Sequence, residues 1–178
     1  MLADLPERVR EQAKRVKLLI LDVDGVMTDG RIIMDDEGRE MKNFDVRDGH
    51  GVKLLIRAGI EVAIMTGRSA SVVNKRAEDL GIREVRQKVY NKLDGYRELT
   101  EEMGVSDEEV CFVGDDLVDI PVLDRVGLPI VVADAIEEAK RRAIYITKSP
   151  GGRGAVREVC ELILQAQGKW DEILRRYC

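Results

Sequence analysis

Short apolar runs alternate along this chain with longer segments in which apolar residues recur every three or four positions. The short runs predict buried strands, and the periodic segments predict helices that pack on them. The alternation predicts an α/β fold with a doubly wound, mostly parallel sheet. We expect strands near residues 18–23, 60–65, 83–86, 110–113, 129–132 and 144–147, and helices near 49–58, 69–80, 92–104, 116–126, 136–142 and 153–167.

Residues 31–46 break this alternation. Residues 31–34 and 39–46 are expected to be two strands of a β-hairpin, joined by a turn that contains Gly38. The hairpin would expose apolar side chains that a lone small domain rarely leaves in water, so we expect a second copy of the chain to cover it. These side chains are Ile32, Ile33, Met34, Met41 and Phe44.

Length and charge limit the classes of protein to consider. The 178 residues suit one domain, 1–178, because domains commonly hold roughly 100 to 150 residues. The formal net charge is −5 without a basic block, which favours a small-molecule partner over nucleic acid. The three cysteines lack CxxC spacing, which disfavours zinc and disulfides. Residues 2–17 are too charged for a signal peptide or a membrane span, so we expect a cytoplasmic protein.

Two acidic residues lie at the end of the first predicted strand. Asp22 directly follows an apolar run, and Asp24 is two positions further on. Ligands of parallel sheets bind beyond the carboxyl ends of strands. Two carboxylates this close need a cation or a proton to offset their repulsion, and an oxygen-rich site without histidine favours Mg²⁺. Later segments bring further polar groups to the same predicted edge: Thr66-Gly67-Arg68, Asn91-Lys92, and Gly114-Asp115-Asp116 with Asp119.

This ordered set resembles the haloacid dehalogenase superfamily of Mg²⁺-dependent phosphatases, over residues 18–119. The resemblance implies a Rossmann-like sheet in which the short hairpin takes the place of a cap domain. It implies that Asp22 attacks phosphorus to form an aspartyl-phosphate, and that Asp24 serves as general acid and then as general base. The implied Mg²⁺ ligands are an oxygen of Asp22, the backbone carbonyl of Asp24, and Asp115.

Other residues of the set have expected roles around the phosphoryl group. The Thr66 hydroxyl and the backbone at Gly67 suit its stabilisation, and Lys92 would bring a positive charge to it. Lys88 is the nearby alternative, but Lys92 begins a helical pattern. For Asp116 and Asp119 the sequence leaves two roles open, which are support of the metal ligands and capping of the next helix.

Four segments narrow the resemblance to the 3-deoxy-D-manno-octulosonate 8-phosphate phosphatases, which are capless homotetramers that make a sugar acid for lipopolysaccharide. The segments are residues 22–30, 46–51, 114–116 and 151–158. Arginines suit the phosphate and the carboxylate of such a substrate, and Arg68, Arg47 and Arg153 are the candidates. The C-terminal segment from about residue 149 is expected to be mobile and to reach a neighbouring active site.

Three other functions remain open. A phosphatase for a sialic-acid-type 9-phosphate would use the same core. A signalling receiver domain would use one aspartate as phospho-acceptor, but Asp24 supplies an acid and base that turnover needs. An inactive assembly module is disfavoured because the catalytic set is complete. His50, the single histidine, has no cysteine or serine partner and receives no catalytic role.

Overall fold

The computed structural model describes residues 5–177, and its centre is a six-stranded parallel sheet in the order β5-β4-β1-β6-β7-β8. Strand β1 pairs with β4 on one side and with β6 on the other, and all four of its residues are buried. The predicted α/β class and the parallel sheet are therefore confirmed. The strands are β1 (Leu18–Leu21), β4 (Glu61–Met65), β5 (Glu84–Arg86), β6 (Val110–Gly114), β7 (Leu128–Val131) and β8 (Tyr145–Ile146).

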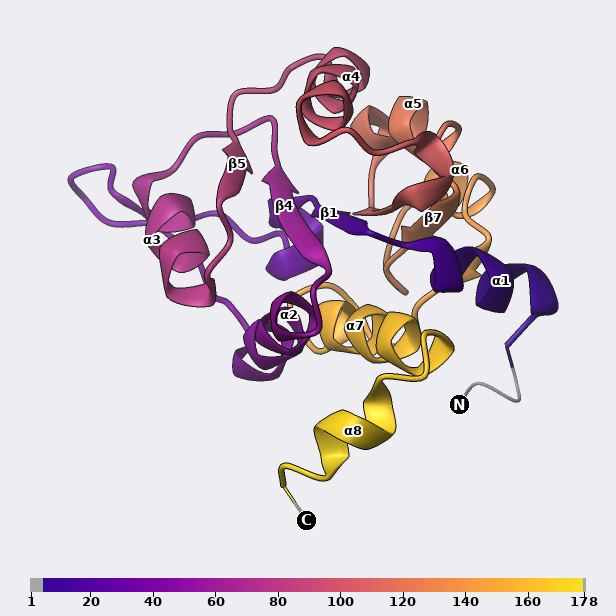
Figure 1. The fold of residues 1–178 in the computed structure, drawn as a ribbon. Helices are drawn as coiled ribbons and strands as arrows, with labels where there is room; N and C mark the ends of the chain where they lie inside the picture. Colours follow the sequence, from indigo (N-terminus) through magenta and orange to yellow (C-terminus); the bar gives the residue numbers. More distant parts are fainter. Residues whose placement is uncertain (1–4, 178) are drawn as a thin grey trace.

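Helices cover both faces of the sheet (Figure 1). Helices α1, α2, α3 and α7 pack together on one face, and α4, α5 and α6 lie on the other. The chain changes face at α4, which connects the edge strand β5 to β6 beyond β1. This reversal makes a switch point beside β1, where ligands of such sheets bind. The helices are α1 (Glu7–Arg15), α2 (Val46–Arg57), α3 (Ser71–Leu80), α4 (Lys92–Met103), α5 (Ile120–Leu123), α6 (Glu137–Lys140), α7 (Ala155–Ala166) and α8 (Trp170–Leu174).

The hairpin between β1 and α2 is shorter than predicted. It pairs β2 (Ile33–Met34) with β3 (Glu40–Met41) in antiparallel fashion, as a sheet of its own. Its second strand does not reach residue 46, because Asp45 accepts two backbone N–H groups and caps helix α2. Helix α2 consequently starts three residues earlier than expected, and Arg47 lies in its first turn.

The single helix predicted over residues 116–126 is wrong. The structure has a short helical turn, η4 (Leu117–Asp119), followed by the four-residue helix α5. Asp116 caps the first turn and Pro121 lies in the first turn of the second. A proline has no N–H to donate to the preceding turn, which separates the two short elements.

Four hairpin side chains are as exposed as the sequence predicts. Their exposed fractions are 57% for Ile32, 39% for Ile33, 61% for Met34 and 52% for Met41. Phe44 departs from the prediction, since it packs against the core beneath the Arg76 guanidinium, 5.6 Å from the ring centroid. Within residues 5–177, no helix has both the length and the apolar composition needed to cross a membrane.

The segment that follows residue 149 joins the body of the protein. The backbone N–H of Gly151 donates to Asp134 Oδ1 and that of Gly152 to the Val26 carbonyl, both at 2.9 Å. Helix α7 then buries seven of its twelve residues against the core. Mobility of this segment stays a prediction, and any movement of its first residues would have to break these hydrogen bonds.

Candidate active site

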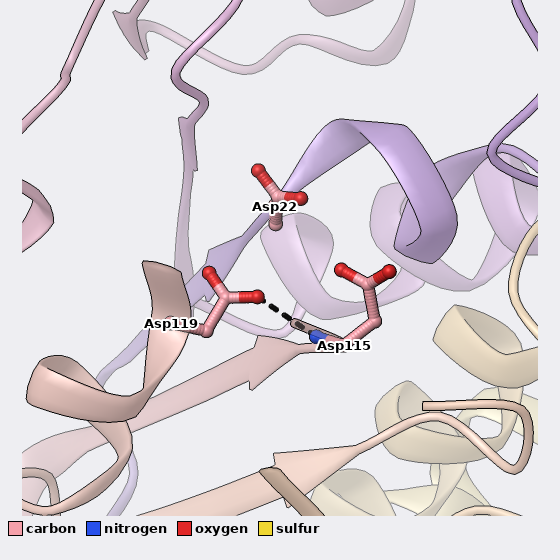
Figure 2. Close-up of side chains that lie close together, drawn as sticks. All are labelled: Asp22, Asp115 and Asp119. Carbon is pink, nitrogen blue, oxygen red and sulfur yellow. Dashed lines mark hydrogen bonds between the residues drawn. The ribbon is translucent and has the colours of Figure 1, made fainter. Parts of the chain in front are cut away.

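Three carboxylates converge at the edge of the sheet where β1 and β6 end (Figure 2). Asp22 directly follows β1, Asp115 directly follows β6, and Asp119 is the last residue of η4. One oxygen of each lies within 4.8 Å of the other two. The register of β1 with β6 explains why these carboxylates lie close together, because Leu21 pairs with Val113 and the two strands end almost level.

Two glycines allow these carboxylates to approach the backbone so closely. Gly25 lies in the turn η2 (Val23–Met27) with a φ of +91°, and a Cβ there would lie 2.0 Å from Asp115 Oδ2. A Cβ on Gly114 would lie 2.6 Å from the Asp119 carboxylate. Only glycine fits both positions, since nothing larger leaves room for the acids.

Lys92 connects two of the three acids. It is the first residue of α4 and its side chain is 2% exposed. Its Nζ lies 2.9 Å from Asp22 Oδ1 and also donates to Asp119 Oδ1. Asp119 Oδ2 accepts the backbone N–H groups of Asp115 and Asp116, at 2.8 and 3.1 Å. Both oxygens of Asp119 are therefore engaged in holding Lys92 and the turn that carries Asp115.

The electrostatics of the cluster suit a cation. Burial, partly opposed by Lys92, raises the pKa of Asp22 to about 6. Burial and the charges of Asp22 and Asp119 raise the pKa of Asp115 to about 8. Burial alone would lower the pKa of Lys92, but the two acids that it contacts hold that pKa above its ordinary value. Buried carboxylates without a histidine among them fit Mg²⁺, a hard cation that prefers oxygen ligands.

A second group surrounds Asp24. Lys42 donates to Asp24 Oδ1, and the Arg68 Nε lies 3.7 Å from Asp24 Oδ2. Thr66 is buried just beyond β4, and its Oγ1 accepts the Arg68 N–H at 3.4 Å. Gly67 lies between these two residues. The structure therefore brings Arg68 to Asp24 and holds Thr66 at the same edge of the sheet as Asp22, since Leu21 also pairs with Ile64.

Known proteins resemble this chain over most of its length. Residues 81–159 match the family of haloacid dehalogenase-like hydrolases. The chain is 51% identical to the 3-deoxy-D-manno-octulosonate 8-phosphate phosphatase KdsC of Escherichia coli, over 92% of this chain and 87% of that protein. The chain belongs to the 3-deoxy-D-manno-octulosonate 8-phosphate phosphatase family.

Solved structures of this phosphatase family share its fold. The enzyme from Yersinia pestis superimposes with a TM-score of 0.91 at 48% identity, over 93% of this chain and 89% of that one. The enzyme from Moraxella catarrhalis, solved in complex with a magnesium ion, a phosphate ion and a KDO molecule, gives a TM-score of 0.94 at 41% identity. That comparison covers 96% of this chain and 98% of the other.

Two of the arginines predicted for this phosphatase lie in a different place from Arg68. Arg47 and Arg153 line a cavity of about 300 Å³, together with Tyr145 and Lys148 among others. Their side chains are 69% and 61% exposed, and each has an acidic neighbour, Asp45 at 3.3 Å and Asp29 at 3.7 Å. The cavity does not include the acidic cluster, so a role for these two arginines in substrate binding stays a prediction.

The two acids whose roles the sequence left open differ in the structure of the phosphatase. Asp116 is exposed, and its side chain accepts the Leu117 N–H at 2.7 Å, which makes it the cap of η4. Asp119 is completely buried and bonded to Lys92. Asp116 therefore caps η4, and Asp119 completes this capping box by accepting the Asp116 N–H while it also bonds to Lys92.

Sequence reasoning missed Glu40 and Lys42 in this phosphatase. The Lys42 side chain is only 1% exposed, and its Nζ lies 2.8 Å from Glu40 Oε1. Burial would lower the pKa of Lys42, but the hydrogen bonds to Asp24 and Glu40 raise it. The available signal was the alternation Glu40-Met41-Lys42, because in a strand residues 40 and 42 share the face opposite to the exposed Met41.

Proposed function

We propose that this chain hydrolyses 3-deoxy-D-manno-octulosonate 8-phosphate to the free sugar acid and phosphate, with Mg²⁺, for lipopolysaccharide precursor synthesis. The observation that carries the proposal is the convergence of Asp22, Asp115 and Lys92 at one edge of the sheet. The names of the relatives supply the sugar acid, and the acidic cluster supplies the place for the cation.

In the proposed reaction, Asp22 attacks phosphorus and the bond from phosphorus to the sugar oxygen breaks. Asp24 gives its proton to the departing sugar oxygen. Asp24 then takes a proton from a water molecule, which attacks the aspartyl-phosphate, releases phosphate and restores Asp22. Lys92 fixes the Asp22 carboxylate through Oδ1, so that its orientation is set before the substrate arrives.

Other groups of the chain would stabilise the transferred phosphoryl group. The Thr66 hydroxyl, the Gly67 backbone and the Lys92 ammonium are polar donors or positive charges at this edge. Mg²⁺ bound by Asp22, Asp115 and the Asp24 carbonyl would neutralise charge on the phosphoryl oxygens and on the acids themselves. Arg68 is the arginine best placed to bind the substrate, because it already reaches Asp24.

Phosphate release from a panel of sugar phosphates, measured with Mg²⁺ and with a chelator, tests this function. We expect sustained release with Mg²⁺, and the highest kcat/KM for 3-deoxy-D-manno-octulosonate 8-phosphate. A higher kcat/KM for a sialic-acid-type 9-phosphate would replace the proposed substrate. A single stoichiometric phosphorylation without turnover would instead indicate a receiver domain.

We also propose that Arg153 of the C-terminal segment binds an anionic group of the substrate, and Arg153→Ala tests this contact. The loss of one charged hydrogen bond to a substrate anion corresponds to about 1.5–3 kcal/mol, so we expect kcat/KM to fall roughly 10- to 100-fold. The melting temperature should stay unchanged, because the side chain is exposed. Arg31→Ala is the matched control, since Arg31 also has Asp29 as its acidic neighbour, at 3.8 Å. Equal kcat/KM values for Arg153→Ala and the parent would remove Arg153 from the substrate site.

We also propose that the chain works as a homotetramer, with the exposed face of the hairpin covered by another copy. Ile32, Met34 and Met41 support this, since they form an apolar surface on a two-stranded element with little core of its own. Sedimentation velocity should show an oligomer that Met34→Glu weakens. A fully active monomer at assay concentration would contradict the proposal. The cytoplasmic location stays a prediction that cell fractionation can test.

A further inference from the structure

Four charged side chains form a closed ring at the base of the hairpin, outside the acidic cluster. Lys42 bridges Asp24 and Glu40, and Arg68 bridges the same two acids from the other side. The Arg68 Nη2 lies 3.1 Å from Glu40 Oε2. Acids and cations alternate around this ring.

The hairpin supplies half of this ring. It differs from an ordinary surface hairpin because it exposes an apolar side chain and buries a charged one. Met41 is 52% exposed, whereas the neighbouring Lys42 side chain is 1% exposed. Burying an ammonium group is costly unless acidic partners compensate it. Asp24 and Glu40 together provide this compensation for Lys42.

The two oxygens of Asp24 differ in their hydrogen bonds within this ring. Oδ1 accepts a hydrogen bond from Lys42. Oδ2 is buried and has no hydrogen-bond partner within the described residues, because Arg68 at 3.7 Å is too far to donate. A buried carboxylate oxygen without a partner is unusual in a folded protein, and a catalytic role is one of the explanations for such a group.

We propose that Lys42, held in place by Glu40, is a positioning residue that fixes the Asp24 carboxylate through Oδ1 and leaves Oδ2 to exchange protons with the substrate. This inference rests on the proposed function, because it assigns the proton transfer to one atom of Asp24. In the first step the proton on Oδ2 passes to the departing sugar oxygen. In the second step Oδ2 takes a proton from the attacking water.

Glu40 has a distinct part in this arrangement. An ammonium group bound only to Asp24 would be free to turn toward the incoming phosphate, which carries more negative charge than one carboxylate. Glu40 holds that ammonium from the hairpin side and also holds Arg68. The hairpin therefore supplies part of the acid and base apparatus from within the same chain, in addition to its apolar outer face.

Lys42→Met, Lys42→Arg and Glu40→Gln test the inference in the full-length protein with Mg²⁺ and the sugar phosphate. We expect Lys42→Met to lower kcat roughly 10- to 100-fold while KM stays within about twofold, as for a group that acts on the transition state. Lys42→Arg should recover most of kcat, since it keeps the charge beside Asp24. Glu40→Gln should lower kcat less than Lys42→Met, again without raising KM.

Arg39→Met is the matched control, because Arg39 lies in the same hairpin but is 71% exposed and pairs only with hairpin acids. Its kcat and KM should equal those of the parent. If Lys42→Met leaves kcat unchanged, or raises KM with kcat intact, the inference is wrong and Lys42 is either structural or a substrate ligand. If Lys42→Met does not fold, Glu40→Gln decides, because an unchanged kcat in that variant would overturn the inference. A wrong proposed function can be distinguished from a wrong inference, since the parent itself would then show no turnover.

Discussion

Asp22→Asn is expected to abolish sustained phosphate release. The side-chain amide keeps the shape of the carboxylate but is not a nucleophile toward phosphorus, so kcat should fall by at least about 10⁴-fold, as when other enzymes lose their nucleophile. The fold should persist, because a neutral amide at this buried position removes the cost of a buried charge. Phosphate release gives kcat, and mass spectrometry of rapidly quenched protein should detect covalent phosphate on the parent alone.

Asp116→Asn is the matched control for this loss. It makes the same acid-to-amide change beside Asp115, but at an exposed residue that only caps η4. Asparagine is an equally good cap, so activity should stay within about threefold of the parent. Turnover by Asp22→Asn at more than about one hundredth of the parent rate would assign the nucleophile to another group.

Asp115→Asn should remove the stabilisation of the protein by Mg²⁺ and reduce activity by about 10³-fold, comparable to the loss of a group that stabilises transition-state charge. In the parent, Mg²⁺ bound to the folded state should raise the melting temperature. This rise should depend on pH, since Mg²⁺ must displace the proton held by Asp115, whose pKa burial and neighbouring acids raise to about 8. Below that pH, Mg²⁺ affinity should weaken by up to about tenfold per pH unit.

In metal-free protein, the stability of the fold should change with pH in the opposite direction. An acid whose pKa is higher in the folded than in the unfolded state stabilises the fold at low pH, and this contribution disappears as pH rises through the folded-state pKa. The pKa values of Asp22 and Asp115 are raised to about 6 and about 8, so metal-free protein should lose stability between about pH 4 and 8. Thermal unfolding at pH 6 and 8.5, with Mg²⁺ and with chelator, measures both trends. An equal Mg²⁺ effect at the two pH values, or one that survives in Asp115→Asn, would place the cation elsewhere.

The ends of the strands were the most predictable part of this protein. Asp22 and Asp115 each follow a continuous apolar run, and parallel pairing of β1 with β6 makes two such ends meet. Helix boundaries were less predictable because single side chains set them. The Asp45 side chain starts α2 earlier than its apolar pattern indicates, and Pro121 separates η4 from α5.

The three candidate arginines show the limit of prediction from sequence pattern. Arg68 follows a strand and lies near Asp24, as strand geometry predicts. Arg47 and Arg153 stand in segments similar to those of the family, yet they line a separate cavity. Long side chains on loops and helix starts take directions that depend on neighbouring elements, and the sequence does not give those directions.

The sequence by itself determined the α/β sheet and the acids at its edge, because apolar periodicity and strand-end position are local properties that need no knowledge of distant contacts. Only the tertiary structure decided the partners of those acids. It connected Asp119 to Lys92, separated by 27 positions, and brought Lys42 of the hairpin to Asp24. The physical reason is that a buried charge must find an opposite charge, and the packing of the whole chain determines which ones come within reach.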